Sequence, residues 1–201
     1  MTSTLSKKHD FDTVFDSQEV FRLILDALSC PARVVSIQKY ADKLFGAHPL
    51  FLTLALTLLD NEVSFCVLGD DLLEDEISSL TLAKKEQLQN ADFIFICSAG
   101  EKEEAQRLQT AIENAKCGTL ADPHKSATII VCDKSPAASY VTLFGPGIAE
   151  TLECHISHAV KNALELRDAQ NYEYPQGIDL IFVSNAGELF ALPRLARMGV
   201  K

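Results

Sequence analysis

One acidic and one basic residue near the C-terminus lie in apolar sequence, at positions where strands rarely carry a charged side chain. Asp179 lies one residue into the apolar run 178–182, and Arg194 follows directly after Pro193. The two could form an ion pair that fixes the register of two strands. Alternatively, the planar fork of Arg194 could bind a carboxylate or phosphate from outside the chain. Charged residues within apolar sequence more often have an internal partner, so we expect the ion pair.

The turn Gly145-Pro146-Gly147 is a second candidate for binding. A phosphate cradle needs successive free backbone N–H groups and the start of a helix. Proline removes one donor, and the segment after Glu150 is not typical of a strong helix, so a tight turn between strands is the simpler interpretation. The functional alternative is a turn that abuts a ligand or a partner's backbone. The candidate ligand- or partner-binding residues are therefore Gly145, Gly147, Glu150, Asp179 and Arg194.

Metal and nucleophile chemistry have weaker support. Cys154, His155 and His158 lie close together, but a zinc site would need a further ligand from elsewhere, and no Cys-x-x-Cys pair is present. A Gly-x-Ser-x-Gly elbow is also missing, and His124 is a candidate acid or base with no identified partner. We expect no metal site, and the sequence nominates no catalytic set.

Apolar periodicity predicts the elements that position these residues. Asp16 and Glu19 are spaced as a capping box for a helix that Pro31 ends, with Phe15 and Val20 as a hydrophobic staple. Further helices are expected at 49–59, 101–114 and 158–167, and strands at 33–37, 63–68, 92–97, 128–132, 140–144 and 151–156. Residues 178–182 and 188–191 form a hairpin through Asn185-Ala186-Gly187. The helix at 49–59 is apolar nearly all round, so it lies in the core or under a partner subunit.

Strands and helices alternate in the first half, which favours a parallel α/β core, and the consecutive strands near the C-terminus favour antiparallel additions. We therefore predict a single domain over residues 1–201, with a flexible lead-in over residues 1–10.

The composition argues against some classes of function. A formal net charge of −10, without clusters of Lys or Arg, disfavours a nucleic-acid partner. The longest strongly apolar run, 50–59, is half of what a membrane crossing needs, and residues 1–10 lack the apolar core of a signal peptide. We expect a cytoplasmic protein with no membrane partner, in which the six cysteines are reduced.

Several motifs, in order, resemble the PhnH family of bacterial phosphonate breakdown. The closing part carries Gly-Pro-Gly-Ile at 145–148, Tyr-Pro-Gln-Gly-Ile-Asp-Leu-Ile-Phe at 174–182 and Ala-Leu-Pro-Arg at 191–194. Earlier pieces lie at 21–32, 58–62 and 118–128, so the resemblance covers about 15–194. One departure is Pro31-Ala32 where the family usually carries Pro-Gly, which puts a positive φ at Ala32 in doubt because non-glycine residues adopt one only at a cost.

The resemblance implies a subunit of the carbon-phosphorus lyase core complex that acts with PhnG, PhnI and PhnJ partners. That assembly forms α-D-ribose 1-methylphosphonate 5-triphosphate from ATP and an alkylphosphonate. Because the resemblance credits this chemistry to the PhnI partner, we expect a non-catalytic transferase subunit, and the resemblance also implies a homodimer in isolation. The alternative is a free-standing nucleotide- or phosphate-binding enzyme that uses Gly145, Gly147 and Arg194.

The family is also described as having a three-layer α/β/α fold with a mixed, mostly parallel sheet, like that of pyridoxal-phosphate-dependent transferases but without the cofactor. A pyridoxal enzyme needs a lysine for the aldimine and an acid against the ring nitrogen. Lys134 has the most plausible position, but its neighbour Asp133 points to the opposite side of an extended chain. We therefore expect no pyridoxal phosphate and no other cofactor.

Overall fold

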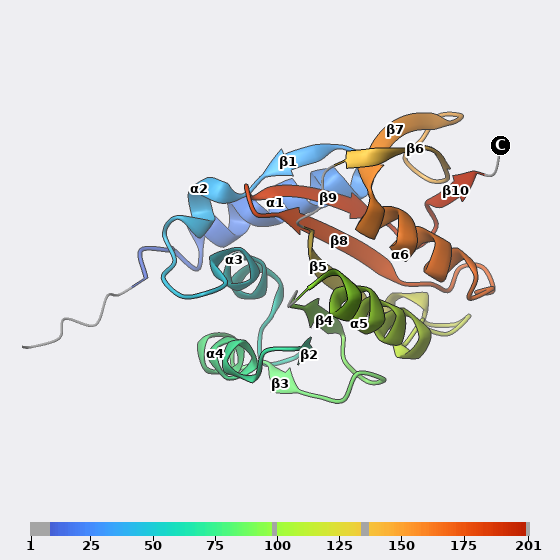
Figure 1. Cartoon of the computed structure of the whole chain (residues 1–201). Coiled ribbons are helices and arrows are strands. Elements are labelled where there is room, and N and C mark those ends of the chain that lie inside the picture. The colour runs from blue at the N-terminus through green and yellow to red at the C-terminus, as the bar shows by residue number, and fades with distance from the viewer. Residues whose placement is uncertain (1–8, 98–99, 134–136, 200–201) are drawn as a thin grey trace, which may run out of the picture.

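A seven-stranded sheet forms the centre of the computed structural model, which describes residues 9–97, 100–133 and 137–199 (Figure 1). Its strands are β1 (Val34–Ser36), β2 (Ser64–Leu68), β3 (Lys84–Lys85), β4 (Phe93–Ile96), β5 (Thr128–Asp133), β8 (Asp179–Ser184) and β9 (Glu188–Leu192). They follow the order β1-β9-β8-β5-β4-β2-β3. Strands β8, β5, β4, β2 and β3 are parallel, whereas β9 is antiparallel to both β8 and β1. The predicted α/β class and mixed, mostly parallel sheet are therefore confirmed.

Helices cover both faces of this sheet (Figure 1). On one side lie α1 (Phe15–Ser29), α2 (Gln38–Ala41), α3 (Pro49–Leu58) and α4 (Asp71–Thr81). The other side carries α5 (Glu101–Asn114) and α6 (His158–Asp168). Alternate residues of β5 divide between the two cores: Ile130 packs with the α1 and α3 side, and Ile129 with the α5 and α6 side.

A second, three-stranded sheet lies beside α6 (Figure 1). It is formed by β10 (Arg197–Gly199), β6 (Ala137–Phe144) and β7 (Leu152–Ser157), in the order β10-β6-β7, and its pairs are antiparallel. Val141, Leu143 and Ile156 from this sheet join the same core as α5 and α6. The predicted antiparallel strands are thus confirmed, although they divide between two sheets.

The start of α1 differs from the predicted capping box. Asp12 caps the helix instead, because its Oδ1 accepts hydrogen bonds from the backbone N–H groups of Val14 (2.8 Å) and Phe15 (2.9 Å). Asp16 lies inside the helix and accepts from the Asp12 N–H, while Glu19 accepts from Tyr40. The predicted staple of Phe15 with Val20 is wrong as well, since the Phe15 side chain is 71% exposed and Val20 is buried.

The apolar helix α3 is part of the core and needs no partner subunit to cover it. Phe51, Leu52 and Leu54 are buried within the chain, and the Phe51 ring packs edge-on against Phe95 of β4 with centroids 5.6 Å apart. At the N-terminal end, His9 and Asp10 are held by hydrogen bonds to the backbone of Phe45 and Lys43.

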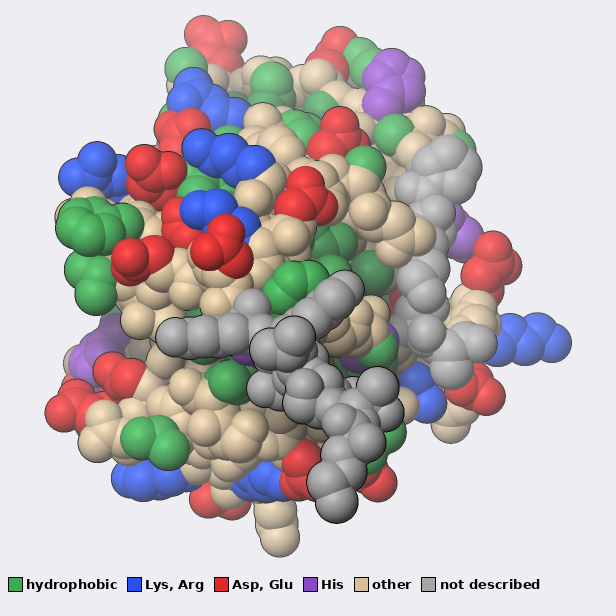
Figure 2. Space-filling view, turned by 90° about the vertical axis from the view of Figure 1, so that its left-hand side faces the viewer, with side chains coloured by type: hydrophobic (Ala, Val, Ile, Leu, Met, Phe, Trp, Pro, Cys, Tyr) green, Lys and Arg blue, Asp and Glu red, His purple; other side chains and the backbone are tan. Residues whose placement is uncertain are grey.

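The distribution of charged side chains on the surface agrees with the absence of basic clusters in the sequence. Basic side chains lie among acidic ones on the face drawn in Figure 2 and form no single basic patch there. In the described residues, every helix is too short or too polar for a bilayer crossing.

Candidate functional site

Asp179 and Arg194 meet at the end of the β8–β9 hairpin. The Arg194 Nη2 donates to Asp179 Oδ2 at 2.5 Å, and Nε donates to Oδ1 at 3.3 Å. The backbone N–H of Arg194 also donates to Asp179 Oδ1 at 2.7 Å. Both side chains are largely covered, at 21% and 17% exposure. The predicted ion pair is therefore present, and it joins the first residue of β8 to the turn that follows β9.

The fork of Arg194 faces into the chain. Its Nε and Nη2 edge is occupied by Asp179, and Nη1 donates to the Pro123 carbonyl in the short 3-10 helix Pro123–Lys125. An external carboxylate or phosphate would have to displace Asp179 to obtain the two-point contact that arginine offers. His124 lies in the same short helix.

The glycine turn after β6 packs against the chain's own backbone. A Cβ at Gly145 would lie 2.5 Å from the Leu195 carbonyl oxygen, and one at Gly147 would lie 2.5 Å from the Ser29 carbonyl oxygen. Their φ angles are +131° and +84°, a region that favours glycine. Close packing and backbone conformation therefore account for both glycines, and Glu150 is exposed beyond the turn.

Ala32 adopts the positive φ that the Pro-Ala sequence had put in doubt. Its φ is 68°, in the left-handed region where a Cβ is crowded. The residue lies just after α1, where the Gly147 backbone approaches Ser29 and Pro31. The turn geometry thus persists without the glycine that would adopt it most easily.

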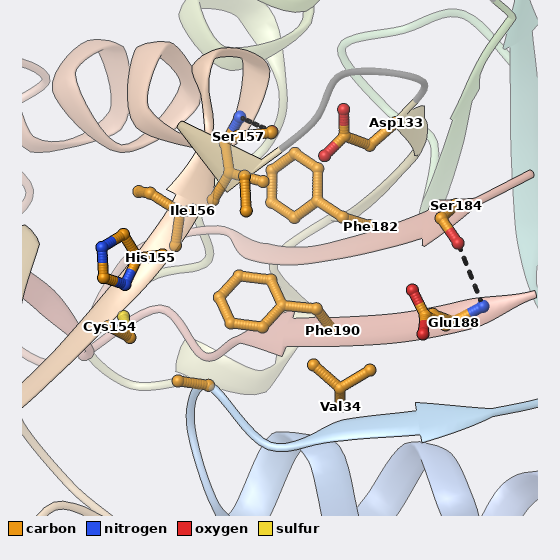
Figure 3. A pocket seen from close by; sticks show the side chains of 13 residues that line it. Val34, Asp133, Cys154, His155, Ile156, Ser157, Phe182, Ser184, Glu188 and Phe190 are labelled. Atoms are coloured by element: carbon orange, nitrogen blue, oxygen red, sulfur yellow. Dashed lines mark hydrogen bonds between the residues drawn. The ribbon is translucent and has the colours of Figure 1, made fainter. Parts of the chain in front are cut away.

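A cavity of about 190 Å³ lies between the two sheets, and we call it the inter-sheet cavity. Its lining comes from the turn after α1 and from β1, β5, β6, β7, α6, β8 and β9. The residues are Ala32, Val34, Asp133, Ala137, Cys154, His155, Ile156, Ser157, Val160, Phe182, Ser184, Glu188 and Phe190. Figure 3 shows the Phe182 and Phe190 rings between Cys154 and His155 on one side and Asp133 and Glu188 on the other. The two ring centroids are 6.3 Å apart.

The place of this cavity is typical of ligand sites in α/β proteins. Asp133 and Ser184 are the last residues of the parallel strands β5 and β8, and ligands commonly bind beyond the carboxyl ends of such strands. The aromatic floor suits a small apolar or planar group. Among the described residues, no Lys or Arg lines the cavity to bind a phosphate or phosphonate.

The thiol in the cavity is poorly suited to nucleophilic attack. Burial raises the pKa of Cys154, so at neutral pH the protonated form predominates, whereas the thiolate is the reactive form. The His155 ring contacts the Tyr140 ring edge-on, with centroids 5.2 Å apart. Among the described residues, Cys154, His155 and His158 do not form a metal-ligand cluster. Lys134 lies outside the described residues.

Comparison with known proteins decides the family. The model of the family described as "Bacterial phosphonate metabolism protein (PhnH)" matches residues 9–199. The chain belongs to the PhnH family. It is also similar to HtxG of Stutzerimonas stutzeri, which carries the name of a C-P lyase subunit, with 29% identity over 188 residues that cover 92% of this chain and 86% of HtxG.

The PhnH-family motifs fall on packing positions in this chain. The segment 174–182 leads into β8 and supplies Asp179, the segment 191–194 ends β9 and supplies Arg194, and the glycine turn abuts the end of α1. The motifs therefore mark the junctions between the hairpin, the short 3-10 helix and the second sheet.

Sequence reasoning missed one residue at this junction, Arg167 of α6. Its side chain is fully buried, and its guanidinium donates to the carbonyl oxygens of Leu192 and Pro193 at 3.2 Å each and also to that of Ala196. Burial lowers the pKa of Arg167 to about 10, so the group is charged at neutral pH. It fastens α6 to the turn that carries Arg194. The helical pattern places Arg167 at the end of α6, but only the fold shows that this position points inward.

Proposed function

We propose that this chain is a non-catalytic assembly subunit of a carbon-phosphorus lyase system for organic phosphonate catabolism. It works with PhnG-, PhnI- and PhnJ-type partners in forming α-D-ribose 1-methylphosphonate 5-triphosphate from ATP and an alkylphosphonate, in the cytoplasm. The observation that carries this proposal is the PhnH family match over residues 9–199, supported by the similarity to HtxG.

The chemistry of the described sites supports a role without catalysis. The triphosphate of ATP and the phosphonate are anionic, whereas the described lining of the inter-sheet cavity contains no Lys or Arg to bind them. A free-standing phosphate-binding enzyme that used Gly145, Gly147 and Arg194 would first have to break the contact of Arg194 with Asp179. The binding energy of such a ligand would be reduced by the loss of that ion pair.

The outer face of α1 offers a surface for partners. Phe21 and Leu25 are one helical turn apart and are 49% and 52% exposed. Val34 of β1, 57% exposed, belongs to the edge strand of the main sheet. Exposed apolar side chains on neighbouring elements, next to an unpaired strand edge, are typical of contact sites. The hairpin edge and the 49–59 helix are less suitable, since β1 covers β9 and α3 is largely buried.

Co-purification tests this proposal. The chain is co-expressed with the PhnG-, PhnI- and PhnJ-type proteins of the same organism, and the complex is measured by size exclusion and native mass spectrometry. We expect a complex of defined stoichiometry that contains this chain, and a homodimer when the chain is purified alone. The variant Phe21→Glu/Leu25→Glu should lose either the complex with the partners or the homodimer. Ala105→Glu on the exposed face of α5 should keep both assemblies. A wild-type chain that joins no complex would contradict the proposal.

The cofactor expectation belongs to the same proposal. A fold like that of pyridoxal-phosphate-dependent transferases, but without the cofactor, predicts a colourless protein that shows no aldimine absorption band after incubation with pyridoxal phosphate. A yellow protein whose band disappears on borohydride reduction, with a modified lysine found by mass spectrometry, would contradict it.

A further inference from the structure

A second group of polar side chains lies beyond the carboxyl ends of β2 and β4, at the same edge of the main sheet that borders the inter-sheet cavity through Asp133 of β5. His48, Asp70 and Cys97 each place one potential metal-ligand atom so that all three atoms lie within 4.8 Å of one another. His48 Nε2 and Asp70 Oδ2 are 2.9 Å apart. The expectation of no metal site was based on local spacing, which could not show this group, because its members come from three distant segments.

Each of the three residues is fixed by the start or end of a regular element. His48 is the N-cap residue of α3, and its ring stacks on Phe51 with centroids 6.1 Å apart. Asp70 is the N-cap residue of α4, where Oδ1 accepts from the Leu73 N–H at 3.0 Å and leaves Oδ2 for His48. Cys97 directly follows β4, and its N–H donates to the Leu68 carbonyl at 3.0 Å.

This set of donor atoms matches a particular class of cation. Imidazole, thiolate and carboxylate together suit Zn²⁺ and its neighbours, whereas Mg²⁺ and Ca²⁺ prefer sites made of oxygen alone. Tetrahedral zinc bonds of about 2.0–2.3 Å place ligand atoms roughly 3.3–3.6 Å apart. The observed separations, from 2.9 Å to at most 4.8 Å, span this value, so small side-chain movements would complete the geometry.

The surroundings also fit a bound cation with one open position. Cys97 is 4% exposed, which shields a metal–sulfur bond, while the His48 and Asp70 side chains are 33% and 28% exposed and leave access for a water. Arg107 lies nearby, where its Nη1 donates to the Cys97 carbonyl at 2.7 Å and its Nη2 lies 3.4 Å from Glu103. One thiolate and one carboxylate supply two negative charges for a divalent ion.

We propose that His48, Asp70 and Cys97 form a binding site for a divalent metal of the zinc class. Binding releases the thiol proton of Cys97, the neutral His48 ring carries its proton on Nδ1 so that Nε2 can bind the metal, and water fills the fourth position. The metal joins the starts of α3 and α4 to the end of β4, so it stabilises the folded chain through the free energy of binding. The site lies apart from the proposed partner surface on α1 and does not depend on the proposed function.

Metal loading of the full chain, purified without a polyhistidine tag, tests the site. Chelator-treated protein is incubated with Zn²⁺, desalted and measured by elemental mass spectrometry and by thermal unfolding. We expect about one zinc per chain and a higher Tm. His48→Gln, Asp70→Asn and Cys97→Ser should each weaken zinc binding at least tenfold. The matched controls Cys154→Ser and His155→Gln, which alter the same residue types in the inter-sheet cavity, should retain it.

A measurement on the wild-type chain tests whether the metal binds Cys97 even if a variant fails to fold. Co²⁺ bound by a thiolate gives an intense charge-transfer band, so the cobalt-loaded chain should show this band. Zinc well below one per chain, or a cobalt spectrum without the thiolate band, would show that the three residues are only a packed thiol beside a His–Asp hydrogen bond.

Discussion

Arg194 holds Asp179 at both ends of the carboxylate, with Nη2 to Oδ2 at 2.5 Å and Nε to Oδ1 at 3.3 Å, and its own backbone N–H binds the same carboxylate at 2.7 Å. The pair links the start of β8 to the turn after β9, while Nη1 reaches the Pro123 carbonyl. One arginine thus joins three segments. Its planar fork supplies contacts in a geometry that the single ammonium group of lysine cannot reproduce.

The contact between Arg194 and Asp179 should contribute to the stability of the fold. Arg194→Lys should lower the free energy of unfolding by about 2 kcal/mol, because it removes charge-assisted hydrogen bonds to a largely covered carboxylate. Denaturant unfolding of the isolated chain measures the effect. The same substitution at Arg33, whose pair with Asp26 is exposed on both sides, should cost much less, because exposed ion pairs contribute little to stability. Equal losses at both positions would argue against a structural role for Arg194.

Ala32 offers a substitution that should stabilise the chain. Its φ of 68° is strained for alanine, so Ala32→Gly should raise the free energy of unfolding by about 0.5–1 kcal/mol after the extra flexibility of glycine in the unfolded chain is counted. Ala105→Gly, in the exposed middle of α5, should instead lower it by about 1 kcal/mol. Thermal unfolding of both variants provides the test. A lower Tm for Ala32→Gly would contradict the inference that the backbone at Ala32 is strained.

Arg167 should be among the most sensitive positions in the chain. Arg167→Met keeps an apolar side chain in the same space but removes the guanidinium donor from the carbonyl oxygens of Leu192 and Ala196, while the Pro193 carbonyl still accepts from the Ala196 N–H. Buried acceptors without partners are costly, so we expect a loss of about 3 kcal/mol or more in chemical denaturation. Lys161→Met, on the same helix, removes only a partly exposed contact with Glu165 and should change stability by less than about 0.5 kcal/mol.

Stability should fall at alkaline pH. Burial raises the pKa of Cys66 from 9.0 to about 12 and the pKa of Tyr172 from 10.0 to about 12. Above pH 9 the unfolded chain therefore loses these protons before the folded chain does. The folded state then binds more protons, so the free energy of unfolding decreases as pH rises, by at most about 1.4 kcal/mol per pH unit for each group.

Tm measured from pH 8 to pH 11 tests this sign. Tyr172→Phe and Cys66→Ala remove one titrating group each, so each should make the alkaline decline shallower, whatever it does to stability at pH 8. A decline that both variants leave unchanged would mean that other groups cause it.

Much of the secondary structure was predictable because its signals are local. The helix at 101–114 begins and ends at the expected residues, and β5 and the β8–β9 hairpin follow from apolar runs bounded by turn residues. The features that the sequence failed to predict also have local causes. Strand β3 is two lysines long, which gives no apolar pattern, and Asp12 competes with Asp16 as the cap of α1. Only the fold selects between such neighbours.

The candidate sites were less predictable, because they depend on contacts between distant segments. The Asp179–Arg194 pair could be proposed since both residues are unusual in their local sequence. Arg167 gave no such signal, because a basic residue in the last turn of a helix is ordinary. The group of His48, Asp70 and Cys97 forms only when parallel pairing sets β2 beside β4. No local spacing rule finds a site of that kind.

Reconstitution of the transferase reaction tests the central claim most directly. ATP and methylphosphonate are incubated with the PhnG-, PhnI- and PhnJ-type partners, with this chain, or with both, and ribose 1-methylphosphonate 5-triphosphate is measured by phosphorus NMR. A non-catalytic assembly subunit predicts product from the complete set, little from the partners without this chain, and none from this chain alone. Turnover of ATP by this chain alone, or full activity of the partners without it, would contradict that role.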